Sequence, residues 1–124
     1  MVMFTLCVKE AFSAAHRLEN YHGRCEELHG HNFMVEAFFK GQSLDQGGMV
    51  IDFALLKNRL HSVLDTLDHK YINDIPFFRE RASSSEYLAM YIFHELKQSF
   101  KEGAAAPAEV RVWESETAWV AYGE

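Results

Sequence analysis

Hydrophobic residues change their spacing twice along this chain, and this change limits the possible folds more than any other feature of the sequence. Near both ends they alternate with a period of two, which is typical of strands with one buried face. In the middle they recur every three to four residues, which is typical of helices. The expected elements are strands at 4–15 and 32–40, helices after Asp52 and after Ser83, and strands at 109–114 and 117–122. The order β-β-α-α-β-β predicts an α+β fold, a four-stranded antiparallel sheet with two helices on one face.

Both expected helices have start signals. Asp52 is a good N-cap for the first helix. Its expected buried stripe consists of Phe53, Leu56, Leu60, Val63, Leu64 and Leu67. For the second helix, Ser83 and Glu86 match a capping box, with Ser83 as N-cap and Glu86 at the third helical position.

Length and composition predict one domain spanning residues 1–124, because 48% hydrophobic residues suffice for one core. No apolar run approaches the ~20 residues that cross a bilayer, and the first residues lack a secretory signal. Cys7 lies in an apolar strand and Cys25 in a polar loop, which favours thiols in a reducing compartment. We therefore expect a cytoplasmic protein without a membrane partner. A net charge of −6, without clustered basic residues, argues against nucleic acid as a partner.

Histidines form the strongest chemical signal. His29 and His31 are two residues apart, so in a strand both imidazoles point to the same side. His16 ends the first expected strand and would lie opposite them if the two strands form a hairpin. Three histidines with an open fourth position are typical of a catalytic zinc site. Spacing alone equally allows a solvated His-Gly-His loop, and it leaves His22 as a substitute ligand for His16.

Two further positions are candidates for proton transfer. Cys25 lies four residues before His29, so a hairpin that closes a metal site would also bring this thiol near it. His69 follows Asp68, and an adjacent carboxylate can orient an imidazole for proton transfer. Cys25 is also open to interpretation as an incidental loop cysteine. Cys7 is expected to be a buried strand residue, and His61 and His94 to be surface or core residues.

The motifs together resemble the 6-pyruvoyltetrahydropterin synthase family over nearly the whole chain. They are the segments at 12–16, 25–33, 50–53, 67–74 and 84–86, followed by Glu114. The spacing from Cys25 to His31 and the run at 67–74 look most like the 6-carboxytetrahydropterin synthase branch, which belongs to queuosine biosynthesis. The resemblance implies the tunnelling fold, whose subunits join into a barrel, commonly as a homohexamer built from two trimers. A barrel would also remove the open edges of the sheet.

The resemblance also implies roles for individual residues. His16, His29 and His31 would bind Zn²⁺, Cys25 would accept a proton, and His69 with Asp68 would form a proton relay. Glu114 would hold the guanidine-like edge of a pterin, since a carboxylate accepts two parallel N–H bonds. Glu116 is the nearby competitor for this role. The remaining substrate contacts would come from Ser84, Ser85, Lys70 and Arg24.

The implied reaction converts 7,8-dihydroneopterin triphosphate to 6-carboxytetrahydropterin, acetaldehyde and triphosphate. Two departures from the family pattern leave sister pterin enzymes open as alternatives. Ser83-Ser84 stands where the family usually has Pro-Thr, and Glu26 and Glu27 lie beside Cys25, where folate-directed members use a glutamate. A zinc-stabilised binding module without catalysis is the alternative from another class.

Overall fold

The computed structural model describes residues 3–19, 27–101 and 103–124. Its strands and helices are β1 (Phe4–His16), β2 (His29–Gly41), α1 (Phe53–Leu64), α2 (Ser85–Ser99), β3 (Ala106–Trp113) and β4 (Trp119–Gly123). Two short 3-10 helices, η1 (Ile72–Asp74) and η2 (Pro76–Phe78), lie between α1 and α2. The predicted order is confirmed, although β2 and β3 each begin three residues earlier than expected. Within the described ranges, no helix has the length and apolar character needed to cross a membrane.

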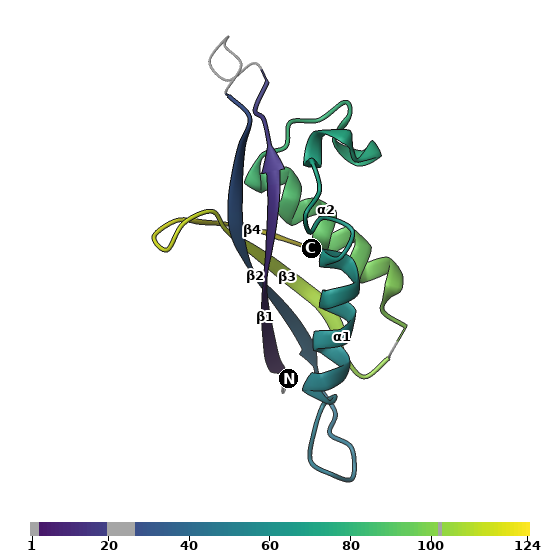
Figure 1. The fold of residues 1–124 in the computed structure, drawn as a ribbon. Helices are drawn as coiled ribbons and strands as arrows, with labels where there is room; N and C mark the ends of the chain where they lie inside the picture. Colours follow the sequence, from purple (N-terminus) through teal and green to yellow (C-terminus); the bar gives the residue numbers. More distant parts are fainter. Residues whose placement is uncertain (1–2, 20–26, 102) are drawn as a thin grey trace.

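The strands form one antiparallel sheet in the order β1-β2-β3-β4. Figure 1 shows both helices on the same face of this sheet, with the other face uncovered. The β1–β2 hairpin is long, and its register runs from Phe4 opposite Gly41 to His16 opposite His29. This register brings the expected metal ligands together at the end of the hairpin.

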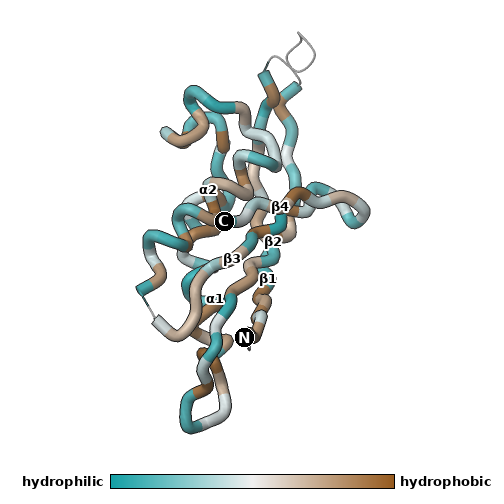
Figure 2. Tube along the Cα trace, turned by 180° about the vertical axis from the view of Figure 1, so that it is seen from behind, coloured by the Kyte–Doolittle hydropathy of each residue, from teal (hydrophilic) through white to brown (hydrophobic). Residues whose placement is uncertain are grey.

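The core lies between the helices and the covered face of the sheet. Alternate residues of β1 and β2 point into it, and the rings of Phe12 and Phe33 stack with centroids 5.0 Å apart. The helices contribute Leu56 and Leu60 from α1 and several residues of α2. Figure 2 views the chain from the opposite side and shows hydrophobic residues on both the strands and the helices. Removing this apolar surface from water is the main force that holds the layers together.

Three expectations about single residues are wrong. Asp52 does cap α1, accepting from the backbone N–H of Ala54 at 2.8 Å, but the neighbouring Phe53 is 52% exposed. Burial at a helix end depends on which segment covers it, and periodicity does not determine that. Cys7 is only partly buried, because it lies on the alternate side of β1, away from the helices.

The third error concerns the start of α2. Its N-cap is Ser84, whose hydroxyl oxygen accepts from the backbone N–H of Tyr87 at 3.2 Å. Glu86 therefore stands at the second helical position, and no capping box with Ser83 forms. Ser83 is instead completely buried next to His16. Three consecutive serines offered the helix more than one possible cap, and the capping-box pattern selected the wrong one.

Candidate metal centre

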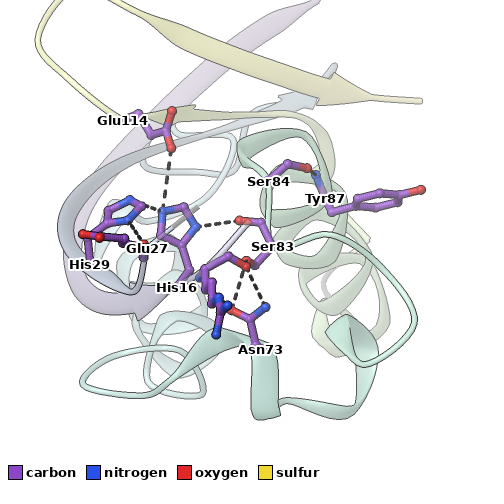
Figure 3. Close-up of polar contacts among 9 residues, drawn as sticks. His16, Glu27, His29, Asn73, Ser83, Ser84, Tyr87 and Glu114 are labelled. Carbon is purple, nitrogen blue, oxygen red and sulfur yellow. Dashed lines mark hydrogen bonds and ion pairs between the residues drawn. The ribbon is translucent and has the colours of Figure 1, made fainter. Parts of the chain in front are cut away.

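Three imidazoles converge where β1 ends and β2 begins. Figure 3 shows two of them, His16 and His29. His16, His29 and His31 each offer one ring nitrogen, and these nitrogens all lie within 4.8 Å of one another. His16 is fully buried, whereas His29 and His31 are partly exposed. The hairpin register explains the convergence, because His16 is the direct partner of His29 and the next pair on the same face of the hairpin is Ala14 with His31. The prediction that the three histidines cluster is confirmed.

Backbone carbonyls determine which ring nitrogen is available in two of these histidines. His16 Nδ1 lies 2.7 Å from the carbonyl oxygen of Ser83, and His29 Nδ1 lies 2.8 Å from that of Glu27. A carbonyl oxygen only accepts, so both Nδ1 atoms carry the proton in the neutral rings. The two Nε2 lone pairs then face each other at 3.0 Å. Such an arrangement is repulsive unless a cation or a proton lies between the nitrogens, and it therefore fits a metal ion.

Burial also favours the neutral ring that a metal ion requires. Desolvation lowers the pKa of His16 below its usual value, and the neighbouring His29 and His31 act in the same direction. The hydrogen bond to Ser83 and the charge of Glu114 oppose this shift. Neutral imidazole suits zinc and several other transition metals, so these three residues can hold a divalent ion.

Glu114 approaches the cluster from the end of β3. Its Oε1 atom lies 4.0 Å from His16 Nε2, and its side chain is 41% exposed. Among the described residues, the group that meets the geometry of a metal site contains the three histidines and not Glu114. A carboxylate at this distance remains accessible to a ligand bound beside the ion.

The segment that follows α1 lies along the outer edge of β1 (Figure 1). Asp68 Oδ1 accepts from the backbone N–H of Ser13 at 2.9 Å, and the N–H of His69 donates to the carbonyl of Ser13 at 2.6 Å. The N–H of Ala15 then donates to the carbonyl of Lys70 at 3.0 Å. This pairing holds Asp68 and His69 at a constant position relative to the end of β1, where His16 lies.

Asp68 orients the imidazole of His69, as expected. The second carboxylate oxygen, Oδ2, lies 3.0 Å from His69 Nδ1, while the side chain of His69 is 82% exposed. The hydrogen bond from Ser13 is the main cause that lowers the pKa of Asp68. His69 also has a positive φ of 58°, a conformation that non-glycine residues seldom adopt. The carboxylate thus stays ionised and accepts from an imidazole that is open to a ligand.

A cavity of about 510 Å³ lies between the histidine cluster and His69, with His31, His69 and Lys70 in its wall. Its volume is in the range of small-molecule sites. The two predicted serine contacts lie at the start of α2: Ser84 caps the helix, and Ser85 Oγ is buried without a hydrogen-bond partner within the described part of the chain. Cys25 and Arg24, together with His22 and Glu26, lie outside the described residues.

Two residues beside the cluster had been given no role in it. Ser83 supplies the carbonyl that accepts from His16, and Asn73 contacts both Ser83 and the backbone of Arg17 (Figure 3). Asn73 belongs to the family-like run at 67–74, and this membership was the only feature of the sequence that could have indicated a role for it.

The antiparallel sheet, its helical layer and a three-histidine cluster beside a cavity define an α+β protein whose histidines could hold a metal ion. A family model described as 6-pyruvoyl tetrahydropterin synthase matches residues 5–124. The chain belongs to this family of pterin synthases, so the family resemblance noted in the sequence is confirmed.

Individual relatives carry names from two branches of the family. A putative 6-pyruvoyl tetrahydrobiopterin synthase from Caenorhabditis elegans is 38% identical over 110 residues, covering 78% of this chain and 79% of the relative. A 6-carboxy-5,6,7,8-tetrahydropterin synthase from Haemophilus influenzae is 29% identical over 144 residues, covering 98% and 100%. The solved structure of the C. elegans 6-pyruvoyl tetrahydropterin synthase matches with a TM-score of 0.88 and 31% identity, covering 100% of this chain and 97% of that one. The expected tunnelling fold of the single chain is confirmed by this match.

Proposed function

We propose that the chain is a zinc-dependent lyase that converts 7,8-dihydroneopterin triphosphate to 6-carboxytetrahydropterin, acetaldehyde and triphosphate. The observation that carries this proposal is the set of three imidazole nitrogens within 4.8 Å of one another, beside a cavity that His69 also lines. Zinc suits three histidines with a fourth position open to substrate. When bound, the ion supplies a Lewis acid that acidifies the substrate's side-chain hydroxyls.

Proton transfer is assigned to His69 and Cys25. Asp68 holds the Nδ1 side of His69, so the Nε2 atom is the one that exchanges a proton with the substrate. Cys25, in the loop between β1 and β2, is the proton acceptor that the family resemblance implies. A thiolate and an imidazole on different sides of the substrate can move protons between neighbouring side-chain carbons.

Substrate recognition is assigned to groups near the histidine cluster and in the wall of the cavity. Glu114 accepts two N–H bonds from the guanidine-like edge of the pterin, and Ser84 and Ser85 contact the ring. Lys70, which lines the cavity, and Arg24 neutralise the triphosphate. Local cations of this kind are necessary because the chain as a whole has a net charge of −6.

The proposed reaction balances without an oxidant. Loss of triphosphate and internal proton shifts convert the dihydroxypropyl side chain into a diketone, while the ring gains the two hydrogens of the tetrahydropterin. Water then cleaves the bond between the two carbonyl carbons, leaving a carboxylate on the pterin and releasing acetaldehyde. The second step is what separates this product from 6-pyruvoyltetrahydropterin.

The 6-pyruvoyl product is the second candidate. The C. elegans relative carries that name and is 38% identical, compared with 29% for the H. influenzae 6-carboxy enzyme. The carbonyl of Glu27 contacts His29, so a glutamate lies beside the histidine cluster. A folate-directed product is therefore a further alternative. All three products arise from the same substrate and the same metal site.

A product assay distinguishes these candidates. We expect purified, zinc-loaded protein incubated with 7,8-dihydroneopterin triphosphate to release equal amounts of 6-carboxytetrahydropterin and acetaldehyde, measured by mass spectrometry and an aldehyde-trapping reagent. A 6-pyruvoyl or 6-hydroxymethyl product without acetaldehyde would overturn the carboxy assignment and support a sister enzyme. Zinc-loaded protein that leaves the substrate unchanged would refute all three.

The open edges of the sheet support a proposed homo-oligomer. Within the described part of the chain, β4 has a strand neighbour on one side only, and the segment at 69–71 covers β1 only near Ser13 and Ala15. Residues 4–11 of β1 therefore keep a free edge, and such an edge is a template for another strand. Pairing of β1 with β4 of a neighbouring subunit would close a trimeric barrel, and two trimers would form the proposed hexamer.

A further inference from the structure

We infer that Asn73 and Ser83 are positioning residues that hold His16 in the orientation needed to bind the metal ion. Neither side chain belongs to the ligand set, and both lie far from His16 in the sequence. They meet His16 and Arg17 just where β1 ends. Figure 3 shows Ser83 and Asn73 beside His16. This inference rests on the proposed metal site and assigns two further residues to it.

Ser83 acts on the ring of His16 through its backbone. Its carbonyl oxygen lies 2.7 Å from His16 Nδ1, and both residues are completely buried. The Ser83 hydroxyl lies 3.1 Å from the carbonyl oxygen of Arg17 and 3.1 Å from Asn73 Oδ1. These contacts hold the residue, and therefore its carbonyl, in one orientation opposite the imidazole.

Asn73 acts on the backbone immediately after the ligand. Its Oδ1 accepts from the N–H of Arg17 at 2.9 Å, and its Nδ2 donates to the carbonyl of Arg17 at 2.8 Å. One amide side chain thus reproduces the paired hydrogen bonds of a neighbouring strand. The end of β1 would otherwise be free to fray, because Arg17 lies beyond the last strand pair, His16 with His29.

This network has a direct consequence for metal binding. A histidine ligand is effective when the hydrogen bond at its second nitrogen keeps the correct tautomer and ring orientation. Without Asn73 or the Ser83 hydroxyl, His16 would bind the ion only after ordering the strand end and the Ser83 carbonyl. Loss of such supporting groups typically costs about 10–100-fold in metal affinity.

The test uses Asn73→Ala and Ser83→Ala. Two controls accompany them: Asn58→Ala on the exposed side of α1, and Ile92→Val, which destabilises the buried face of α2 without touching the network. We expect the zinc dissociation constant, measured by competition with a chromophoric chelator, to rise about 10–100-fold in both test variants and to stay within about twofold in both controls. Ser83→Ala keeps the backbone carbonyl and removes one hydroxyl, so it remains informative if Asn73→Ala does not fold.

Long-range ¹H–¹⁵N NMR of the imidazole nitrogens in metal-free protein gives a second readout. We expect the Nδ1–H tautomer of His16 in the unsubstituted protein and a mixture of tautomers in the test variants, while His29 stays Nδ1–H because its acceptor is Glu27. Unchanged zinc affinity and an unchanged His16 tautomer in folded variants would overturn the inference. If the unsubstituted protein does not bind zinc, or if His29→Ala binds it equally well, the metal site itself is refuted instead.

Discussion

Protein in which His29 is replaced by alanine is expected to lose its metal ion and, with it, all turnover of 7,8-dihydroneopterin triphosphate. His29 Nε2 lies 3.0 Å from His16 Nε2, and His29 belongs to the group of three histidines whose ring nitrogens lie within 4.8 Å of one another. Removing a ligand should weaken binding by more than the ~100-fold upper range typical of supporting residues. Metal content after dialysis, measured by inductively coupled plasma mass spectrometry, reports this directly.

His61→Ala is the matched control for this substitution. It also removes one imidazole, but His61 lies on α1 and pairs with Glu10 at 3.0 Å, away from the cluster. We expect it to keep one equivalent of metal and normal turnover. One equivalent of metal retained in His29→Ala would show that this histidine is not a ligand.

His69→Ala is expected to lower turnover by about 10²–10⁴-fold while leaving metal content unchanged, because this range is typical of a lost general acid or base. The side chain is 82% exposed and contacts Asp68 rather than the core, so its removal should leave the fold intact. Steady-state kinetics and metal analysis of the same preparation provide the two measurements. Normal turnover with bound metal would remove His69 from the proton relay.

Cys25→Ala tests whether the loop between β1 and β2 also supplies a proton-transfer group that is not a metal ligand. We expect turnover to be abolished with little loss of zinc, in contrast to His29→Ala, which loses the metal itself. Cys7→Ala is the control, since Cys7 lies on β1 far along the hairpin from the three histidines. Equal metal loss in Cys25→Ala and His29→Ala would contradict separate roles for thiol and imidazole.

The order of elements and the histidine cluster could be predicted because both depend on the regular spacing of residues along the chain. Alternation in β1 and β2 identifies the covered face, and the two-residue spacing of His29 and His31 puts both rings on that face. Once the strands pair as a hairpin, His16 has to lie opposite. These conclusions need only local pattern and the simplest connection between neighbouring strands.

The supporting residues could not be predicted, because they depend on the path of a segment without periodicity. Residues 65–84 contain two 3-10 helices and pair with the edge of β1 through single backbone contacts. Ser83 therefore reaches His16 across 67 positions of sequence, and Asn73 reaches Arg17 across 56. The capping-box pattern predicted Ser83 as the helix N-cap instead. A serine hydroxyl suits both a helix N-cap and a loop position that hydrogen-bonds to the backbone.

X-ray absorption spectroscopy at the zinc edge reports whether His16, His29 and His31 together hold one ion with a position left for substrate. We expect three imidazole nitrogens at about 2.0–2.1 Å and one light-atom ligand that changes when substrate or product is added. Sulfur in the coordination shell, or four protein ligands that stay unchanged on adding substrate, would contradict it.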